Sequence, residues 1–297
     1  MARRRVTHPV LARDGELIVE RDPGRPTGRL LIQEEMESSY VDLANPTHLE
    51  FDYTRWLRIV LRSSRARRIV HVGGGACALP RALAAEWPDG RQEVCELDSG
   101  VLALAREHMG LRRAPGLRVR HADGREWLAS QPDHSHDAVV IDAFLGARIP
   151  LRLVTVEALR DVARVAPLAL VNVVDDRSRR VVDRVAAGLA EAFDHLCTLG
   201  GRSGNTIVMG TSGERLPLEQ ISAAVAADPS PATLTAAAAL ARRIAATAPA
   251  RDPQPPGPQP PDPASLEPRP PEPRPPEPPP PEPRPPEPRS SSGELAR

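Results

Sequence analysis

The chain has 297 residues, with 39 basic and 39 acidic side chains, and therefore carries no formal net charge. This balance gives no reason to expect nucleic acid or an anionic membrane as a partner. Every one of the 39 basic residues is an arginine, so mechanisms that need a lysine, such as a Schiff base or a P-loop, are excluded.

The N-terminal stretch is basic but no apolar segment follows it, so we expect that it is not a secretory signal. No run approaches the ~20 apolar residues that span a membrane. The three cysteines, Cys77, Cys95 and Cys197, lack a CxxC spacing and suit neither a disulfide framework nor a zinc site. We therefore expect a soluble, cytoplasmic protein without a metal.

Residues 1–60 predict a small β-hairpin cap followed by a lead-in helix. Two β-like runs, at 15–22 and 28–43, are separated by the turn-rich sequence PGRPTG. Residues 47–64 then place apolar side chains at a spacing that suits a buried helix.

From residue 61 to 215 strands and helices alternate. The predicted strands are 67–73, 91–98, 116–123, 136–144 and 168–176, the predicted helices are 77–88, 99–110, 124–130, 155–167 and 179–193, and 195–202 with 204–212 form an antiparallel pair. Short connections between alternating elements indicate an α/β fold with a doubly wound, mostly parallel sheet. Ligands of such sheets bind at the carboxyl ends of the strands, beside the topological switch point.

The remaining chain divides into a helical segment, 216–250, and a proline-rich tail, 251–297. The tail holds 21 of the 35 prolines, mixed with glutamate and arginine. This composition favours polyproline II and cannot form a core, so we expect a disordered tail. A docking segment for a proline-binding partner domain is the alternative.

The first predicted strand ends in Gly73, Gly74 and Gly75. Glycines at this place let the chain turn tightly and bring backbone N–H groups to a ligand. With Ala78, the spacing also satisfies the loose G-x-G-x-x-A form, so a dinucleotide site and a purely structural turn both stay open.

Acidic residues follow the next two strands. Glu96 comes about twenty residues after the glycines, where an acid accepts hydrogen bonds from ribose hydroxyls. Asp98 suits a helix cap better. Asp123, followed by Gly124, stands where a carboxylate can accept the adenine amine, or can cap the next helix, or can do both.

Asp142 directly follows the apolar run 138–141 and therefore emerges from a buried strand into the predicted cleft. Burial would raise the pKa of its carboxyl group and a nearby cation would lower it. Asp175 and Asp176 end the fifth strand and either extend this acidic edge or cap a helix. Acids at successive strand ends suit a cationic ligand, such as an adenosyl sulfonium with an amine, better than a pyrophosphate.

The order of these motifs resembles the spermidine synthases, or polyamine aminopropyltransferases, and more closely their divergent actinobacterial branch. The resemblance covers roughly residues 28–212. It is carried by GGGACALPRALA, EVCELDSGVLALAREH, LRVRHADGREWL, HDAVVIDAF and TVEALRDVARV, supported by SSYVDLANPTHLEFDYTRWL before the glycines and GNTIVM near the end.

The resemblance implies a class I methyltransferase-type Rossmann core and a seven-stranded sheet behind a β-rich N-terminal region. It also implies decarboxylated S-adenosylmethionine as aminopropyl donor and a diamine such as putrescine as acceptor. The glycines at 73–75 would form the nucleoside loop. Glu96 would hold the ribose, Asp123 would contact the adenine, and Asp142 would be the catalytic acid that orients and deprotonates the amine.

Three departures from the family's pattern concern its amine-binding groups. Ala76 replaces the acid that follows the glycines, and Leu145 replaces a second acid after Asp142. The Gln and the Tyr-His pair that surround the acceptor site in the family cannot be identified in this chain, because Ser38, Ser39 and Tyr40 occupy the matching stretch. Each lost charge-assisted contact is worth roughly 1.5–3 kcal/mol.

Four functions therefore stay open at the level of sequence. Aminopropyl transfer leads, followed by methyl transfer from intact S-adenosylmethionine, since Ala76 removes a like-charge conflict with that donor's carboxylate. A non-catalytic nucleoside-binding scaffold that recruits partners through the proline tail is the third, and an NAD-dependent oxidoreductase is the fourth. Spermidine synthases commonly form dimers or tetramers, but no motif in the chain identifies a homodimer interface.

Overall fold

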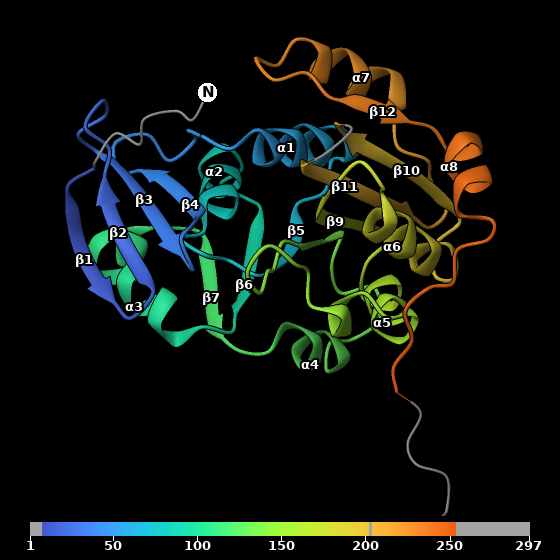
Figure 1. Cartoon of the computed structure of the whole chain (residues 1–297), viewed down its shortest axis with the longest axis horizontal. Helices are drawn as coiled ribbons and strands as arrows, with labels where there is room; N and C mark the ends of the chain where they lie inside the picture. The colour runs from blue at the N-terminus through green and yellow to red at the C-terminus, as the bar shows by residue number, and fades with distance from the viewer. Residues whose placement is uncertain (1–7, 202–203, 254–297) are drawn as a thin grey trace, which may run out of the picture. The chain divides into compact units, whose positions relative to one another are not determined.

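Two β-sheets organise the residues that the computed structural model describes, 8–201 and 204–253 (Figure 1). These residues belong to one compact unit that ends at Pro253. Most of the expected disordered tail, residues 254–297, lies outside the described residues. Residues 250–252 still pair with α5 (Val156–Val165), because Val156 N donates to Ala250 O and Asp252 N donates to the Glu157 carboxylate, each at 2.9 Å.

The N-terminal sheet is antiparallel, in the order β1-β2-β3-β4. Its strands are β1 (Val10–Asp14), β2 (Leu17–Arg21), β3 (Gly28–Gln33) and β4 (Met36–Asp42). The sequence predicts a single small hairpin here, and the structure extends it with β1 and with a tight turn at Glu34–Glu35. β1 (VLARD) does not show the alternation of apolar and polar residues that predicts a strand with one buried face, and most of its side chains are exposed.

This sheet packs on the central domain through an apolar face. Leu17, Val19 and Leu31 join Val101 and Leu102 of α3 (Ser99–His108) in one buried cluster. The end of β4 also reaches the glycine turn, where the Ala76 backbone N–H donates to Ser39 Oγ at 3.2 Å. The N-terminal sheet therefore helps to hold the loop after the first central strand.

The central sheet has eight strands in the order β12-β10-β11-β9-β8-β5-β6-β7. Their bounds are β5 (Arg68–Val72), β6 (Arg91–Glu96), β7 (Leu117–His121), β8 (Ala138–Ile141), β9 (Leu168–Asp175), β10 (His195–Gly200), β11 (Gly204–Thr211) and β12 (Thr233–Thr235). The five strands from β9 to β7 are parallel, and β10, β11 and β12 pair antiparallel. This order confirms the predicted doubly wound, class I methyltransferase-type sheet, to which β12 adds an eighth strand at the edge.

Helices cover both faces of the central sheet through two buried clusters. One cluster holds side chains of α1 (Asp52–Ser64), α2 (Ala78–Glu86) and α7 (Leu218–Ala226), and the other holds side chains of α4 (Gly124–Ala129), α5, α6 (Arg180–Ala190) and α8 (Ala237–Ile244). No helix in 8–201 or 204–253 is both long and apolar enough to cross a membrane. The switch point lies at β5, whose two neighbours, β6 and β8, continue in opposite directions along the sheet.

Two predicted helices begin later than the sequence suggests. The lead-in helix predicted from residue 47 begins at Asp52, since residues 47–51 run outside the helix toward the sheet. The alanine-rich stretch from Thr233, predicted as helix, first forms β12, which pairs with Thr198–Gly200 of β10. Threonine at both ends of that strand and an open sheet edge outweigh the helix propensity of the alanines that follow.

Candidate functional site

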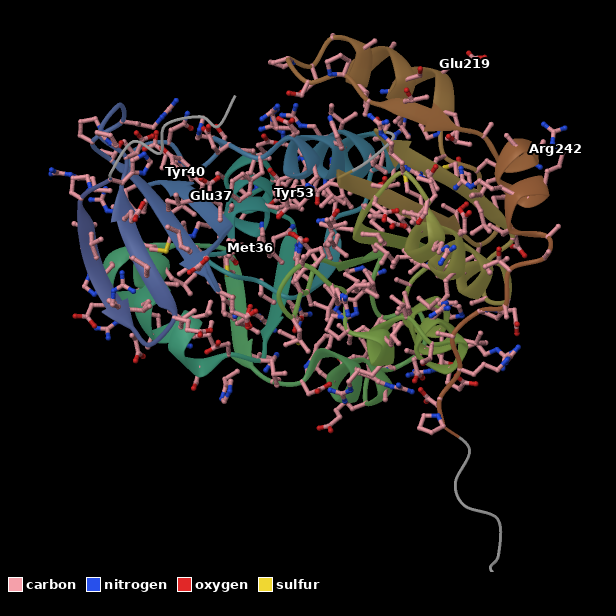
Figure 2. All side chains as sticks on the ribbon, in the orientation of Figure 1. Met36, Glu37, Tyr40, Tyr53, Glu219 and Arg242 are labelled. Carbon is pink, nitrogen blue, oxygen red and sulfur yellow. The ribbon has the colours of Figure 1, made fainter. Side chains whose placement is uncertain are left out.

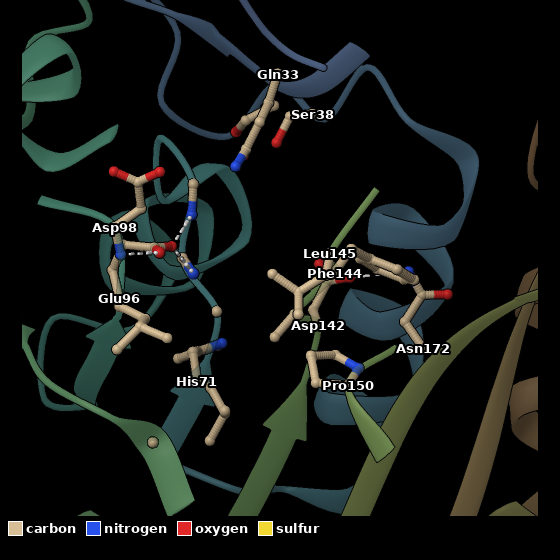
Figure 3. Close-up of a pocket in the computed structure, with 18 of the residues that line it drawn as sticks. Gln33, Ser38, His71, Glu96, Asp98, Asp142, Phe144, Leu145, Pro150 and Asn172 are labelled. Atoms are coloured by element: carbon tan, nitrogen blue, oxygen red, sulfur yellow. Dashed lines mark hydrogen bonds between the residues drawn. The ribbon is translucent and has the colours of Figure 1, made fainter. Parts of the chain in front are cut away.

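A cavity of about 790 Å³ opens at the carboxyl ends of β5, β6, β7, β8 and β9 (Figure 3). The residues proposed from sequence for the site all line it, namely Gly73, Gly74, Gly75, Glu96, Asp123, Gly124 and Asp142. The β3–β4 hairpin and α1 complete the wall (Figure 2 labels Met36, Glu37 and Tyr53 on these elements). The strand-end rule therefore located the cavity.

The glycine loop has its shape because it packs directly against the strand that carries Asp142. Gly73 has a φ of +85°, and a Cβ on it would lie 2.3 Å from the Asp142 carbonyl oxygen. A Cβ on Gly74 would lie 2.6 Å from a methyl carbon of Val94. No other residue type fits at Gly73 without movement of the backbone around it, and at Gly74 the Val94 side chain would have to move.

We expect Gly73→Ala to destabilise the fold by about 3 kcal/mol, since a left-handed alanine costs ~1–2 kcal/mol and the clash adds a similar amount. Gly204→Ala is the matched control. Its φ is +84°, and a Cβ there would meet no described atom within 4 Å. Urea unfolding of both variants separates the cost of a left-handed alanine from the cost of the clash. Equal losses of stability would show that the packing of Gly73 on Asp142 contributes nothing.

Glu96, at the end of β6, holds this loop in place. Its Oε2 accepts hydrogen bonds from the N–H groups of Gly74 and Gly75, both at 2.9 Å, and its Oε1 accepts from Asp98 N at 3.0 Å. Asp98 caps α3 by accepting from the N–H groups of Gly100 and Val101. The capping role therefore falls to Asp98, and Glu96 places a carboxylate beside the glycines.

Asp123 caps α4 and also forms an ion pair. Its Oδ1 accepts from the N–H groups of Arg125 and Glu126, and its Oδ2 accepts from the Arg152 guanidinium. Burial acts to raise the pKa of Asp123, but the hydrogen bond from Arg152 and those from the backbone outweigh it and lower the pKa. Gly124 is required beside it, since a Cβ there would lie 2.5 Å from a Val72 methyl group.

Asp142 follows β8 directly and lies in the floor of the cavity. Asn172, on β9, donates from Nδ2 to Asp142 Oδ1 at 2.8 Å (Figure 3). Burial raises the pKa of Asp142 to about 6, although hydrogen bonding to Asn172 and Tyr53 opposes the rise. The same burial, together with the Asp142 charge, raises the pKa of Tyr53 well above its usual value. The carboxyl group of Asp142 therefore titrates closer to neutral pH than an exposed aspartate does.

The sequence analysis did not single out several cavity residues, among them Tyr53, His71 and Asn172. His71 hydrogen-bonds through Nε2 to Gln92 Oε1 at 2.9 Å, and burial lowers its pKa to about 4, so its imidazole is neutral. His71 and Asn172 are polar residues within otherwise apolar strand runs, a signal that could have identified both. Tyr53 gave no such signal, because an aromatic side chain on a buried helix is ordinarily core.

The other acidic residues near the strand ends either line the cavity or accept hydrogen bonds from backbone N–H groups outside it. Asp175 accepts from the N–H groups of Val181 and Val182, and Asp176 accepts from that of Ser178, so neither lines the cavity. Glu34 and Glu37 of the β3–β4 hairpin do line it. Arg152 is the only arginine among the described residues of the wall. The cavity is therefore strongly acidic and suits a cationic ligand.

Comparison with known proteins gives two informative matches. Over 165 residues the chain is 26% identical to the polyamine aminopropyltransferase of Vibrio vulnificus (strain CMCP6), a match that spans 54% of this chain and only 55% of that protein. The structure superposes on a probable spermidine synthase from Corynebacterium glutamicum with a TM-score of 0.75 and 27% identity, covering 84% of this chain and 97% of the other. The chain is thus similar to spermidine synthases in sequence and in fold.

A third match supports the fold alone. A spermidine synthase in complex with the transition-state analogue AdoDATO has a TM-score of 0.55 at 13% identity, covering 71% of this chain and 76% of that one. No family model matches the sequence. Within residues 8–201 and 204–253 no group of three or more His, Cys, Asp or Glu could hold a metal ion.

The structure places the two residues that depart from the spermidine synthase pattern in different surroundings. Ala76 is fully buried and does not line the cavity. Leu145 lines the cavity and is 67% exposed at its mouth. The loss of charge at position 145 is therefore the departure that the ligand would meet.

Proposed function

We propose that the protein transfers the aminopropyl group of decarboxylated S-adenosylmethionine to a diamine such as putrescine and releases methylthioadenosine. The observation that carries this proposal is the Asp142 carboxylate, which stands in the floor of an acidic cavity with a pKa of about 6 and is held by Asn172. A base with this pKa is largely ionised at neutral pH and can still accept a proton.

The reaction needs one proton acceptor and one leaving group. An amine in water is protonated at neutral pH, so Asp142 binds the ammonium and removes its proton. The free electron pair of the nitrogen then attacks the carbon next to the sulfonium. The new C–N bond forms as the C–S bond breaks, and the electron pair of that bond neutralises the sulfur in methylthioadenosine.

In this proposal the adenosine of the donor binds at the end of the cavity that lies beside the glycines. The glycines 73–75 lie at the start of α2, where they allow a ligand to approach the backbone closely. In this proposal Glu96 accepts from the ribose hydroxyls and Asp123 from the adenine amine, while both keep the backbone hydrogen bonds described above. Gly124 leaves room beside the base.

The charges of the wall favour the decarboxylated donor over S-adenosylmethionine itself. The carboxylate of S-adenosylmethionine would enter a cavity lined by Glu34, Glu37 and Asp142. Arg152, the one arginine of the described wall, is already paired with Asp123 at the other end. The decarboxylated donor carries only positive charge, and the three carboxylates named above then all attract it.

The test is binding and turnover by the full-length protein. We expect calorimetry to show tighter binding of decarboxylated S-adenosylmethionine than of S-adenosylmethionine and no binding of NAD. Methylthioadenosine should form only when an amine acceptor is added. A preference for S-adenosylmethionine with release of S-adenosylhomocysteine would replace the proposal with methyl transfer, and a failure of all nucleosides to bind would point to a scaffold.

A further inference from the structure

Residues 250–252 form a short strap, here called the C-terminal strap, across the beginning of α5. The strap follows α8 in the chain and runs past α5 (Figure 1). The Ala250 carbonyl oxygen accepts from Val156 N, and Asp252 N donates to the Glu157 carboxylate, each at 2.9 Å. These bonds engage the first turn of α5, where backbone N–H groups have no partner within the helix. The strap therefore has a defined place on the protein, although none of its residues lines the cavity.

The side chain of Asp252 also connects the strap to α4. Its two carboxylate oxygens accept from Nη1 and Nη2 of Arg125, the two-pronged geometry that makes arginine–carboxylate pairs strong and specific. Both side chains are partly buried. The same Arg125 Nη1 donates to the carbonyl oxygen of Arg152 at 2.8 Å. Arg125 thus joins the strap to the segment between β8 and α5, in which Arg152 lines the cavity.

Arg152 closes a ring of hydrogen bonds around Asp123. The Arg152 guanidinium donates to Asp123 Oδ2, and Asp123 Oδ1 accepts from the backbone N–H of Arg125 at 2.9 Å. Asp123 and Arg152 line the cavity, whereas Arg125 and Asp252 lie outside it. An unbroken series of hydrogen bonds therefore leads from the strap to a carboxylate of the cavity wall.

The charges along this series are balanced only when the strap is in place. Two guanidinium groups, of Arg125 and Arg152, meet two carboxylates, of Asp252 and Asp123. The hydrogen bond from Arg125 lowers the pKa of Asp252, so this carboxyl group is ionised at neutral pH. Without Asp252, Arg125 would lose this ion pair and would be drawn toward Asp123, in competition with Arg152 and with a ligand.

We propose that Asp252 is a positioning residue for the nucleoside end of the cavity, beside the glycines at 73–75 and Asp123. This inference rests on the nucleoside binding in the proposed function and holds whichever group is transferred. The docked strap occupies Arg125, so Arg152 stays on Asp123 Oδ2 and the carboxylate keeps one orientation. Because coupling between two binding events is reciprocal, a nucleoside that needs this orientation also stabilises the docked strap.

The test is calorimetry of methylthioadenosine with the full-length Asp252→Asn variant. We expect the Kd to rise about fivefold, within the range in which residues of a coupled network change affinity. Asp252→Glu keeps the charge and should recover most of the loss. Asp183→Asn is the matched control, because it removes a partly buried carboxylate that pairs with Arg243 outside the cavity. It should cost a similar amount of stability in urea and leave the Kd unchanged.

Two further measurements test the route through Arg152. In an Arg152→Gln background, Asp252→Asn should change the Kd less than twofold, because the connection to Asp123 is already broken. A full fivefold effect in that background would overturn the route. Saturation with methylthioadenosine should slow hydrogen exchange at the Val156 amide, which donates to the strap, in wild type but not in Asp252→Asn.

The outcomes separate this inference from the proposed reaction. Equal Kd values in wild type, Asp252→Asn and Asp183→Asn would overturn the role of the strap and leave aminopropyl transfer standing. Equal rises in the two variants would reflect a general loss of stability and would overturn that role as well. The expected loss in Asp252→Asn together with an absence of turnover would overturn the reaction and support the strap. A wild type that binds no nucleoside would overturn both.

Discussion

Asp142→Asn should reduce kcat for methylthioadenosine release by about 10³ or more, because removal of a positioned general base typically costs 10²–10⁴. The asparagine fills the same space and can still hydrogen-bond to Asn172, so the affinity for methylthioadenosine should stay within about twofold. Single-turnover assays and calorimetry measure the two quantities. Asp176→Asn, at the end of the next strand but outside the cavity, is the control and should retain full activity.

The same substitution should have a pH-dependent effect on stability with a definite sign. The pKa of Asp142 is raised from 3.8 to about 6 by burial, so between these values the native state binds more protons than the unfolded state. The native state therefore loses stability as the pH rises through this range, by ~2–3 kcal/mol in total. Asp142→Asn should be more stable than wild type by about that amount at pH 8, with the difference disappearing near pH 3.

Activity should move in the opposite direction to stability. The ionised form of Asp142 is the base, so the wild-type kcat should fall as the pH drops through about 6. Surviving turnover in Asp142→Asn would show that this carboxylate has a structural role and that the proton leaves by another route. Unchanged stability at pH 8 would show that burial does not raise the pKa of Asp142.

Glu96→Gln should raise the Kd for methylthioadenosine about 100-fold. The carboxylate accepts three backbone N–H groups, and an amide must turn its own NH₂ toward one of them. The substitution should distort the glycine loop and weaken the proposed contact with the ribose. The expected loss is large because charge-assisted hydrogen bonds are worth ~1.5–3 kcal/mol each. Calorimetry with methylthioadenosine measures the loss.

Two controls separate binding from folding in this variant. Glu126→Gln removes an exposed carboxylate on α4 outside the cavity and should leave the Kd unchanged. Urea unfolding of Glu96→Gln shows how much of the effect is structural. Unchanged nucleoside affinity would mean that Glu96 serves the loop alone and that another group holds the ribose.

The central sheet and the outline of the site were predictable because both depend on local patterns. Short strand-like runs that end in Gly73, Glu96 or Asp142 mark parallel strands, and topology then brings their carboxyl ends to one edge. The helix caps at Asp98 and Asp123 follow from short-range hydrogen bonding in the same way. Each of these inferences needs only a few neighbouring residues.

The rest depends on contacts between distant parts of the chain. The hydrogen bond from Asn172 to Asp142 joins residues thirty positions apart, and the approach of Glu34 to Gly146 joins two sheets. β12 is three residues long and forms only because the edge of β10 is open. No local pattern encodes such pairings, so these walls of the cavity emerge only from the folded structure.

The contact between Gly73 and the Asp142 carbonyl has an evolutionary consequence. A side chain on Gly73 would displace the strand end that carries the proposed base, so the nucleoside loop and the base must be inherited together. The hairpin at 33–38 and the loop at 144–148 make no such demand on each other's backbone. In the proposed reaction, new amine acceptors can therefore arise by substitution in these two loops, while the residues proposed to bind the donor stay fixed.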